Sequence, residues 1–194
     1  MRRSPLEVWT MEQILSSEER AILLQAAREA IESRLQRRRP NYPQASGNLK
    51  KKCGAFVTLY EKGKLRGCIG FVTAARPLLQ TVIEAAEASA FHDPRFPPLE
   101  SRELGEITID ISVLSEPRPV RSLEEIQVGT HGLIVRQGHR SGLLLPQVAT
   151  EYGWDRETFL THTCYKAGLP GDCWRSPDTE IELFGAEVFG ERSP

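Results

Sequence analysis

Apolar residues recur at the spacing of a helix in three parts of the chain, residues 16–37, 77–91 and 155–166. Ser16 and Glu19 form a capping box at the start of the first segment, which ends before Pro40. Gly168 suits the C-terminal cap of the last segment. These features predict three helices.

Between these segments, apolar and polar residues alternate as they do in strands. The clearest half-buried strand is residues 107–113, in which isoleucine and valine alternate with polar residues. The other strand-like segments are residues 55–60, 65–72, 132–135, 143–145 and 181–184. A four-residue loop, Glu61 to Lys64, predicts one hairpin, and the glycines at 138 and 142 predict a second. Because hairpins pair strands antiparallel, we expect an α+β fold, mainly an antiparallel sheet flanked by helices.

The composition is typical of a globular protein. The chain has 194 residues, of which 40% are hydrophobic and 26% charged, and we expect one domain over residues 1–194. The net charge of -1 disfavours a protein that coats nucleic acid. Arg2 and Arg3 are followed by no long apolar run, so we expect no secretory signal, no membrane span and a cytoplasmic location.

Four cysteines, Cys53, Cys68, Cys164 and Cys173, are expected to be reduced thiols, because the cytoplasm is a reducing compartment. Two disulfides are the alternative. The chain has no paired cysteine or histidine spacing for a metal ion and no glycine loop for phosphate. The sequence therefore predicts no metal site and leaves the cofactor unknown.

Six segments, in order along the chain, resemble the AMMECR family. The most distinctive is the hexapeptide Leu65-Arg66-Gly67-Cys68-Ile69-Gly70. The other matching segments are residues 54–59, 93–99, 131–133, 144–149 and 164–169. Together the matching blocks extend from about residue 16 to near residue 190.

This resemblance implies an α+β fold with a larger and a smaller lobe and a cleft between them. It also implies a site without an assigned reaction. Some relatives are encoded beside a dioxygenase-like protein and a radical-SAM protein, which implies protein partners from neighbouring genes. Fold and family do not by themselves fix a function.

The hexapeptide itself suggests a reactive thiol. On a regular strand, Arg66, Cys68 and Gly70 lie on one face, and a nearby cation favours the thiolate. Gly67 and Gly70 permit close approach of a ligand, or of another part of the backbone. The alternative is that Cys68 is an inert, buried, small hydrophobic residue.

Four further residues are candidates for the same site. His131 precedes a predicted strand and could orient or deprotonate the thiol, although the sequence favours the alternative, a loop histidine that caps a turn. Asp93 and Arg95, in a proline-rich loop, could bind a polar substrate or clamp the loop by an ion pair. Gln147 is a further substrate-binding candidate, on a helical face that it shares with Glu151.

Three functions follow from these residues. The leading hypothesis is an enzyme or small-molecule-binding protein with a cleft at the 65–70 strand. A second is a non-enzymatic adaptor that uses an apolar patch of Phe91, Phe96 and Leu99. The third is RNA binding through seven basic residues between Arg34 and Lys52, although the near-neutral net charge disfavours it.

Overall fold

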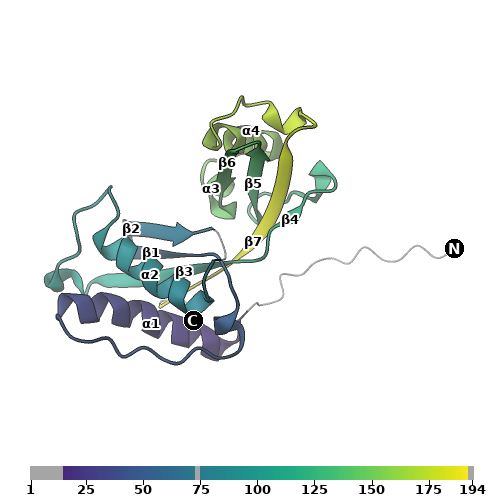
Figure 1. The fold of residues 1–194 in the computed structure, drawn as a ribbon. Coiled ribbons are helices and arrows are strands. Elements are labelled where there is room, and N and C mark those ends of the chain that lie inside the picture. Colours follow the sequence, from purple (N-terminus) through teal and green to yellow (C-terminus); the bar gives the residue numbers. More distant parts are fainter. Residues whose placement is uncertain (1–14, 73–74, 192–194) are drawn as a thin grey trace.

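The structure, a computed structural model, describes residues 15–72 and 75–191. The expected α+β class is confirmed: a curled antiparallel sheet carries helices on its faces (Figure 1). The α-helices are α1 (Ser17–Leu35), α2 (Leu78–Phe91), α3 (Pro146–Glu151) and α4 (Arg156–Lys166). The strands are β1 (Ala55–Glu61), β2 (Lys64–Phe71), β3 (Ile107–Leu114), β4 (Arg118–Pro119), β5 (His131–Gln137), β6 (Arg140–Leu144) and β7 (Glu180–Gly190). Arg2 and Arg3 lie outside the described residues.

The strand order is β2-β1-β3-β7-β5-β6, with β4 paired to β7. The long strand β7 joins the two parts of the sheet, because its first half pairs with β5 and its second half pairs with β3. Figure 1 shows the result: β1, β2 and β3 with α1 and α2 form a larger lobe, and β5 and β6 with α3 and α4 form a smaller one.

In the larger lobe, α1 and α2 cover one face of β1–β3. Val57, Leu59 and Ile109 are fully or almost fully buried against Leu23 and Val82 of the helices. Burial of side chains of this size contributes about 1.5–3 kcal/mol each. The apolar stripe that predicted both helices is therefore the surface that covers the sheet.

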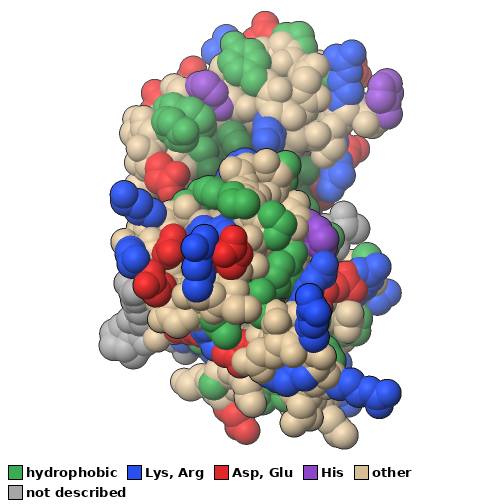
Figure 2. Space-filling view, turned by 90° about the vertical axis from the view of Figure 1, so that its left-hand side faces the viewer, with side chains coloured by type: hydrophobic (Ala, Val, Ile, Leu, Met, Phe, Trp, Pro, Cys, Tyr) green, Lys and Arg blue, Asp and Glu red, His purple; other side chains and the backbone are tan. Residues whose placement is uncertain are grey.

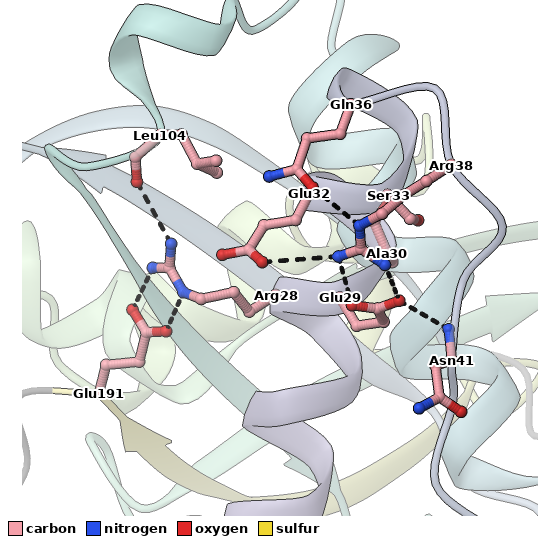
Figure 3. Close-up of polar contacts among 10 residues, drawn as sticks. All are labelled: Arg28, Glu29, Ala30, Glu32, Ser33, Gln36, Arg38, Asn41, Leu104 and Glu191. Atoms are coloured by element: carbon pink, nitrogen blue, oxygen red, sulfur yellow. Dashed lines mark hydrogen bonds and ion pairs between the residues drawn. The ribbon is translucent and has the colours of Figure 1, made fainter.

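The first helix begins and docks through specific polar contacts. The predicted capping box is confirmed, with Ser16 accepting from the Glu19 N–H and Glu19 accepting from the Ser16 N–H. Further along α1, Arg28 donates from Nε and Nη2 to Glu191, both at 2.6 Å, and from Nη1 to the Leu104 carbonyl (Figure 3). These bonds connect the helix to the chain just beyond β7.

Two short connections differ from the sequence prediction. The first hairpin turns over two residues, Lys62 and Gly63, rather than four, because both adopt positive φ angles (51° and 79°) that match the twist of the strands. In the smaller lobe, Cys164 of α4 and Cys173 form a disulfide. The expectation of four reduced thiols is therefore wrong for this pair: the turn at Gly168 brings the chain back beside α4, and the two Cα atoms lie 6.0 Å apart.

Within residues 15–72 and 75–191, no helix is both long and apolar enough to cross a membrane.

Candidate functional site

Cys68 lies on β2, at the outer edge of the sheet, and its thiol is partly exposed. It pairs with Thr58 of β1, whose hydroxyl donates to the Cys68 sulfur at 3.3 Å. The neighbouring residue Gly67 faces α2, so Cys68 points to the opposite face of the sheet, which α1 and α2 leave uncovered. The thiol is therefore free, half-buried and hydrogen-bonded.

Asp93 and Arg95 hold the backbone of Cys68 at this edge. The Asp93 carboxylate accepts from the Cys68 N–H at 2.9 Å, and Arg95 Nη2 donates to the Cys68 carbonyl at 3.0 Å. The two side chains also bind each other, which holds the pKa of Asp93 far below its usual range. Together they occupy hydrogen-bonding groups that an edge strand otherwise presents to other chains.

The structure corrects the expectation that Arg66 shares a face with Cys68. A β-bulge places Leu59 opposite Gly67 but Tyr60 opposite Leu65, so that Arg66 is an extra residue in β2. The bulge breaks the regular alternation, and Arg66 is buried with its Nε 2.7 Å from Glu103. This guanidinium donates to both carboxylate oxygens of Glu103 and lowers the pKa of that residue.

Both glycines of the hexapeptide are sites of close approach within the protein itself. A Cβ atom on Gly67 would lie 2.2 Å from the carbonyl oxygen of Ser89 in α2. A Cβ on Gly70 would lie 2.3 Å from the ring of Phe56 and 2.5 Å from the Ala55 carbonyl oxygen. Packing therefore accounts for both glycines.

Polar groups also surround Thr58 and Tyr60 on the face of β1 that Cys68 shares. Asp110 of β3 pairs with Thr58 and shares its face. Burial raises the pKa of Tyr60, and the nearby acidic groups of Asp110, Cys68 and Glu151 raise it further. Because Glu151 belongs to α3, the smaller lobe contributes a carboxylate to the surroundings of this face.

His131 is in a different part of the protein from Cys68. Its Nδ1 accepts from the Gln127 N–H at 3.1 Å, which assigns the ring proton to Nε2. Burial lowers the pKa of His131, and the nearby Arg118 lowers it further. All these neighbours belong to the smaller lobe and the segment that leads into it, and among the described residues His131 has no hydrogen bond with Cys68. Gln147 is exposed on the first turn of α3.

A cavity of about 570 Å³ lies between the lobes, beyond the end of β2. Its apolar lining comes from both lobes: Val72 and Leu114 from the larger, Ile134 and Phe184 from the smaller. Cys68 and Gly70 share one face of β2, and Val72, the residue after the end of this strand, lines the cavity. Gly70 and Val72 also line a second hollow of about 380 Å³.

Most of the other lining residues are polar: Lys51, Lys52, Cys53, Ser115, Glu116 and Arg136. The lysines belong to the basic stretch that suggested RNA binding. Burial raises the pKa of the Cys53 thiol, which disfavours its reactive form. The basic run was the only sequence signal for this site, because Leu114, Ile134 and Phe184 have the pattern of ordinary core residues.

Neither the basic stretch that suggested RNA binding nor the apolar residues that suggested an adaptor form one continuous surface. Arg34 lies over the Phe91 ring, 4.7 Å from its centroid, and Arg38 pairs with Glu29, so the basic stretch is not one free cationic surface. On the face drawn in Figure 2, basic and acidic side chains are interspersed. Leu99 is only 3% exposed and belongs to the core, so it does not form an apolar surface patch with Phe91 and Phe96.

The described part of the chain contains no group of three or more histidine, cysteine, aspartate or glutamate side chains placed to hold a metal ion.

Comparison with known proteins agrees with the hexapeptide and the other matching segments. The model of the AMMECR1 family matches residues 24–189. Protein MK0488 of Methanopyrus kandleri is 47% identical over 190 residues, which cover 93% of this chain and 92% of that protein. A protein of Thermococcus gammatolerans is 47% identical over 184 residues, covering 89% of this chain and 90% of its own.

A solved structure has the same fold. The crystal structure of the uncharacterised protein PH0010 from Pyrococcus horikoshii superposes with a TM-score of 0.83 at 43% identity, covering 94% of this chain and 96% of that one. The family match, the similar sequences and the shared fold lead to one conclusion: this chain belongs to the AMMECR1 family.

Proposed function

We propose that this protein binds a small molecule in the cavity between its lobes. The observation that carries the proposal is the cavity itself, about 570 Å³ in volume and lined from both lobes. Ligand sites of proteins are hollows of roughly 300–1,000 Å³, mostly apolar with a few polar groups. The centre of the proposed site is therefore Val72 and Leu114, next to the hexapeptide rather than on it.

Filling the cavity tests this proposal. A fragment library is screened by ligand-observed NMR against the wild type and against Val72→Trp, whose indole would occupy the apolar end of the cavity. The matched control is Val188→Trp, because Val188 is 57% exposed on β7 and does not line the cavity. We expect the bound fragments to lose at least about tenfold in affinity for Val72→Trp, because the substitution removes the space that they need.

The control variant should keep every fragment. Fragments that bind Val72→Trp as well as they bind the wild type, or a screen without any bound fragment, would contradict the proposal. Thermal unfolding of both variants shows whether each one is folded before it is screened.

The second candidate function is chemistry at Cys68. It is favoured by one observation, a partly exposed free thiol that accepts a hydrogen bond from Thr58 while Asp93 and Arg95 fix its backbone. A thiol used for catalysis needs to be accessible and activated by its surroundings. A thiol in this role also needs a group that accepts its proton, and the carboxylates of Asp110 and Glu151, which both influence Tyr60, are the candidates that we propose.

Alkylation rates distinguish a reactive thiol from an inert one. Cys53→Ser leaves Cys68 as the single cysteine outside the disulfide. For an activated thiol we expect iodoacetamide to label the folded variant at least about tenfold faster than the unfolded chain at neutral pH. Labelling that is no faster than in the unfolded chain would reject catalysis by Cys68 and leave the cavity proposal intact.

A further inference from the structure

We infer that the ligand of the cavity is an amphiphilic anion, a molecule with an apolar body and one carboxylate, sulfonate or phosphate group. This inference rests on the proposed binding function and adds the chemical class of the ligand. Two features of the lining carry it: an apolar floor at the junction of the lobes, and two lysines that form no ion pair with a described residue.

The apolar floor is formed where the two halves of the sheet meet. Leu114, Ile134 and Phe184 are each at most 4% exposed and pack together in one cluster, with Val72 at its margin. The same four side chains line the cavity. A ligand group in contact with them gains from leaving water, about 25 cal/mol for each Å² of apolar surface that it buries. The floor therefore favours hydrocarbon or aromatic groups.

The cationic side of the cavity is held in place by α2. The Leu78 N–H donates to the Lys51 carbonyl at 2.8 Å, and Lys52 forms an isolated β-bridge with Pro77. Both side chains line the cavity, and neither ammonium group forms an ion pair with a described residue. The two backbone contacts with the start of α2 therefore fix Lys51 and Lys52 at the cavity, where their positive charges are not paired with a described acidic residue.

The remaining charges of the lining do not cancel these lysines. Arg136 is paired with Glu182, with Nε 3.0 Å from the carboxylate, so this pair adds no net charge. Glu116 is the single acidic residue among the lining residues, against two lysines. The excess charge is positive, and a partly enclosed apolar hollow strengthens its attraction for an anion.

A matched pair of fluorescent probes tests the ligand class. Anilinonaphthalene sulfonate and phenylnaphthylamine have the same rings and differ by the sulfonate group. Both are titrated into the full chain, as wild type, as Lys51→Ala/Lys52→Ala and as Lys50→Ala/Lys64→Ala. The last variant loses the same charge at two exposed lysines that do not line the cavity.

We expect the wild type to bind the sulfonate probe more tightly than the uncharged one. The Lys51→Ala/Lys52→Ala variant should lose about tenfold in affinity for the sulfonate probe, because the sulfonate interacts with the ammonium groups of the two lysines. It should keep its affinity for the uncharged probe, which has no group that attracts them. The Lys50→Ala/Lys64→Ala variant should match the wild type for both. Added salt should weaken binding of the sulfonate probe alone.

The outcomes separate the two proposals. If both probes bind the wild type equally and the lysine substitutions change neither, the inferred ligand class is wrong while the cavity remains a binding site. If Val72→Trp binds both probes as the wild type does, the probes bind elsewhere and the cavity proposal itself fails.

Discussion

The carboxylate of Asp93 is a buried group that holds the edge strand β2 at Cys68. It accepts from the Cys68 N–H and from the backbone and guanidinium of Arg95, and its side chain is only 1% exposed. A buried carboxylate with this many donors is held in its charged form. The position of Cys68 therefore depends on a charge 25 residues away in sequence.

Asp93→Asn should lower the free energy of unfolding by about 2 kcal/mol at neutral pH, because a neutral amide replaces charge-assisted bonds. The folded-state pKa of Asp93 is depressed, so its stabilising effect is present above the unfolded value and is lost as the pH falls toward the folded value. The difference between variant and wild type should therefore stay constant from neutral pH down to about pH 4 and narrow below it. Urea unfolding across this pH range measures it.

Asp178→Asn is the control, because Asp178 is exposed and its side chain has no hydrogen bond or ion pair with a described residue. Equal stability of Asp93→Asn and the wild type at neutral pH would show that the bonds of Asp93 to Cys68 and Arg95 do not stabilise the edge strand β2.

At the residue scale, the sequence predicts contacts that are local in the chain and misses those that depend on pairing. The capping box of Ser16 and Glu19 spans three residues and follows from residue types alone. The orientation of Arg66 depends on a bulge that appears only when β2 pairs with β1, so the strand pattern gave the wrong face for it.

At the scale of elements, β2 and α2 are packed with almost no space between their backbones. The Ser89 hydroxyl of α2 accepts from the Ile69 N–H at 2.8 Å and donates to the Val57 carbonyl at 2.7 Å. This one side chain therefore bonds the helix to both β2 and β1. Gly67 permits this approach because it has no side chain.

Gly67→Ala should lower the free energy of unfolding by about 2–3 kcal/mol, because its Cβ would overlap the Ser89 carbonyl and force the helix away. Gly105→Ala is the matched control: it has open space around it and no positive φ, and we expect a change within about 0.5 kcal/mol. Chemical denaturation of both variants measures the difference. Similar stability of the two variants would contradict the tight packing of α2 on β2.

The disulfide links α4 to the chain that returns beneath it. Reduction, or the double change Cys164→Ala/Cys173→Ala, should lower the free energy of unfolding by about 2–3 kcal/mol, as expected for a short closed loop. Peptide mapping without reductant checks the bond, and denaturation with and without reductant measures its effect. The double variant should be insensitive to reductant, and a wild type that is equally insensitive would contradict the bond.

The three long helices and the two hairpins follow from the sequence, because each has its own periodicity or turn residues, whereas the six residues of α3 are too few to show a helical period. The full length of β7 could not be predicted from the sequence, because the strand pattern covers only residues 181–184, near its start. The second half gains its partner, β3, from a distant part of the chain.

At the scale of the whole molecule, β7 makes the two lobes share one sheet. Leu183 packs in the core of the smaller lobe, while Phe189, six residues later, packs in the core of the larger one. The cavity lies at this junction, and no local pattern could have predicted it, since its lining comes from five separate parts of the chain.

Leu183→Ala should lower the free energy of unfolding by about 2–4 kcal/mol, since it leaves a cavity in the core. Because β7 connects the lobes, we expect hydrogen exchange to become faster in β1 and β3 as well as in β5. Mass spectrometry of exchanged peptides measures this, with Val188→Ala, at an exposed position, as the control. Faster exchange confined to the smaller lobe would show that the lobes unfold separately.

The position of β7 in the chain has a consequence for synthesis. Proteins emerge from the ribosome N-terminus first, and domains that are complete can fold while translation continues. Here the strand that both lobes require follows all the other strands and helices. Nascent chains that have not yet been extended past residue 180 should therefore remain substrates for chaperones, because β5 lacks its partner in the first half of β7 and β3 lacks its partner in the second half.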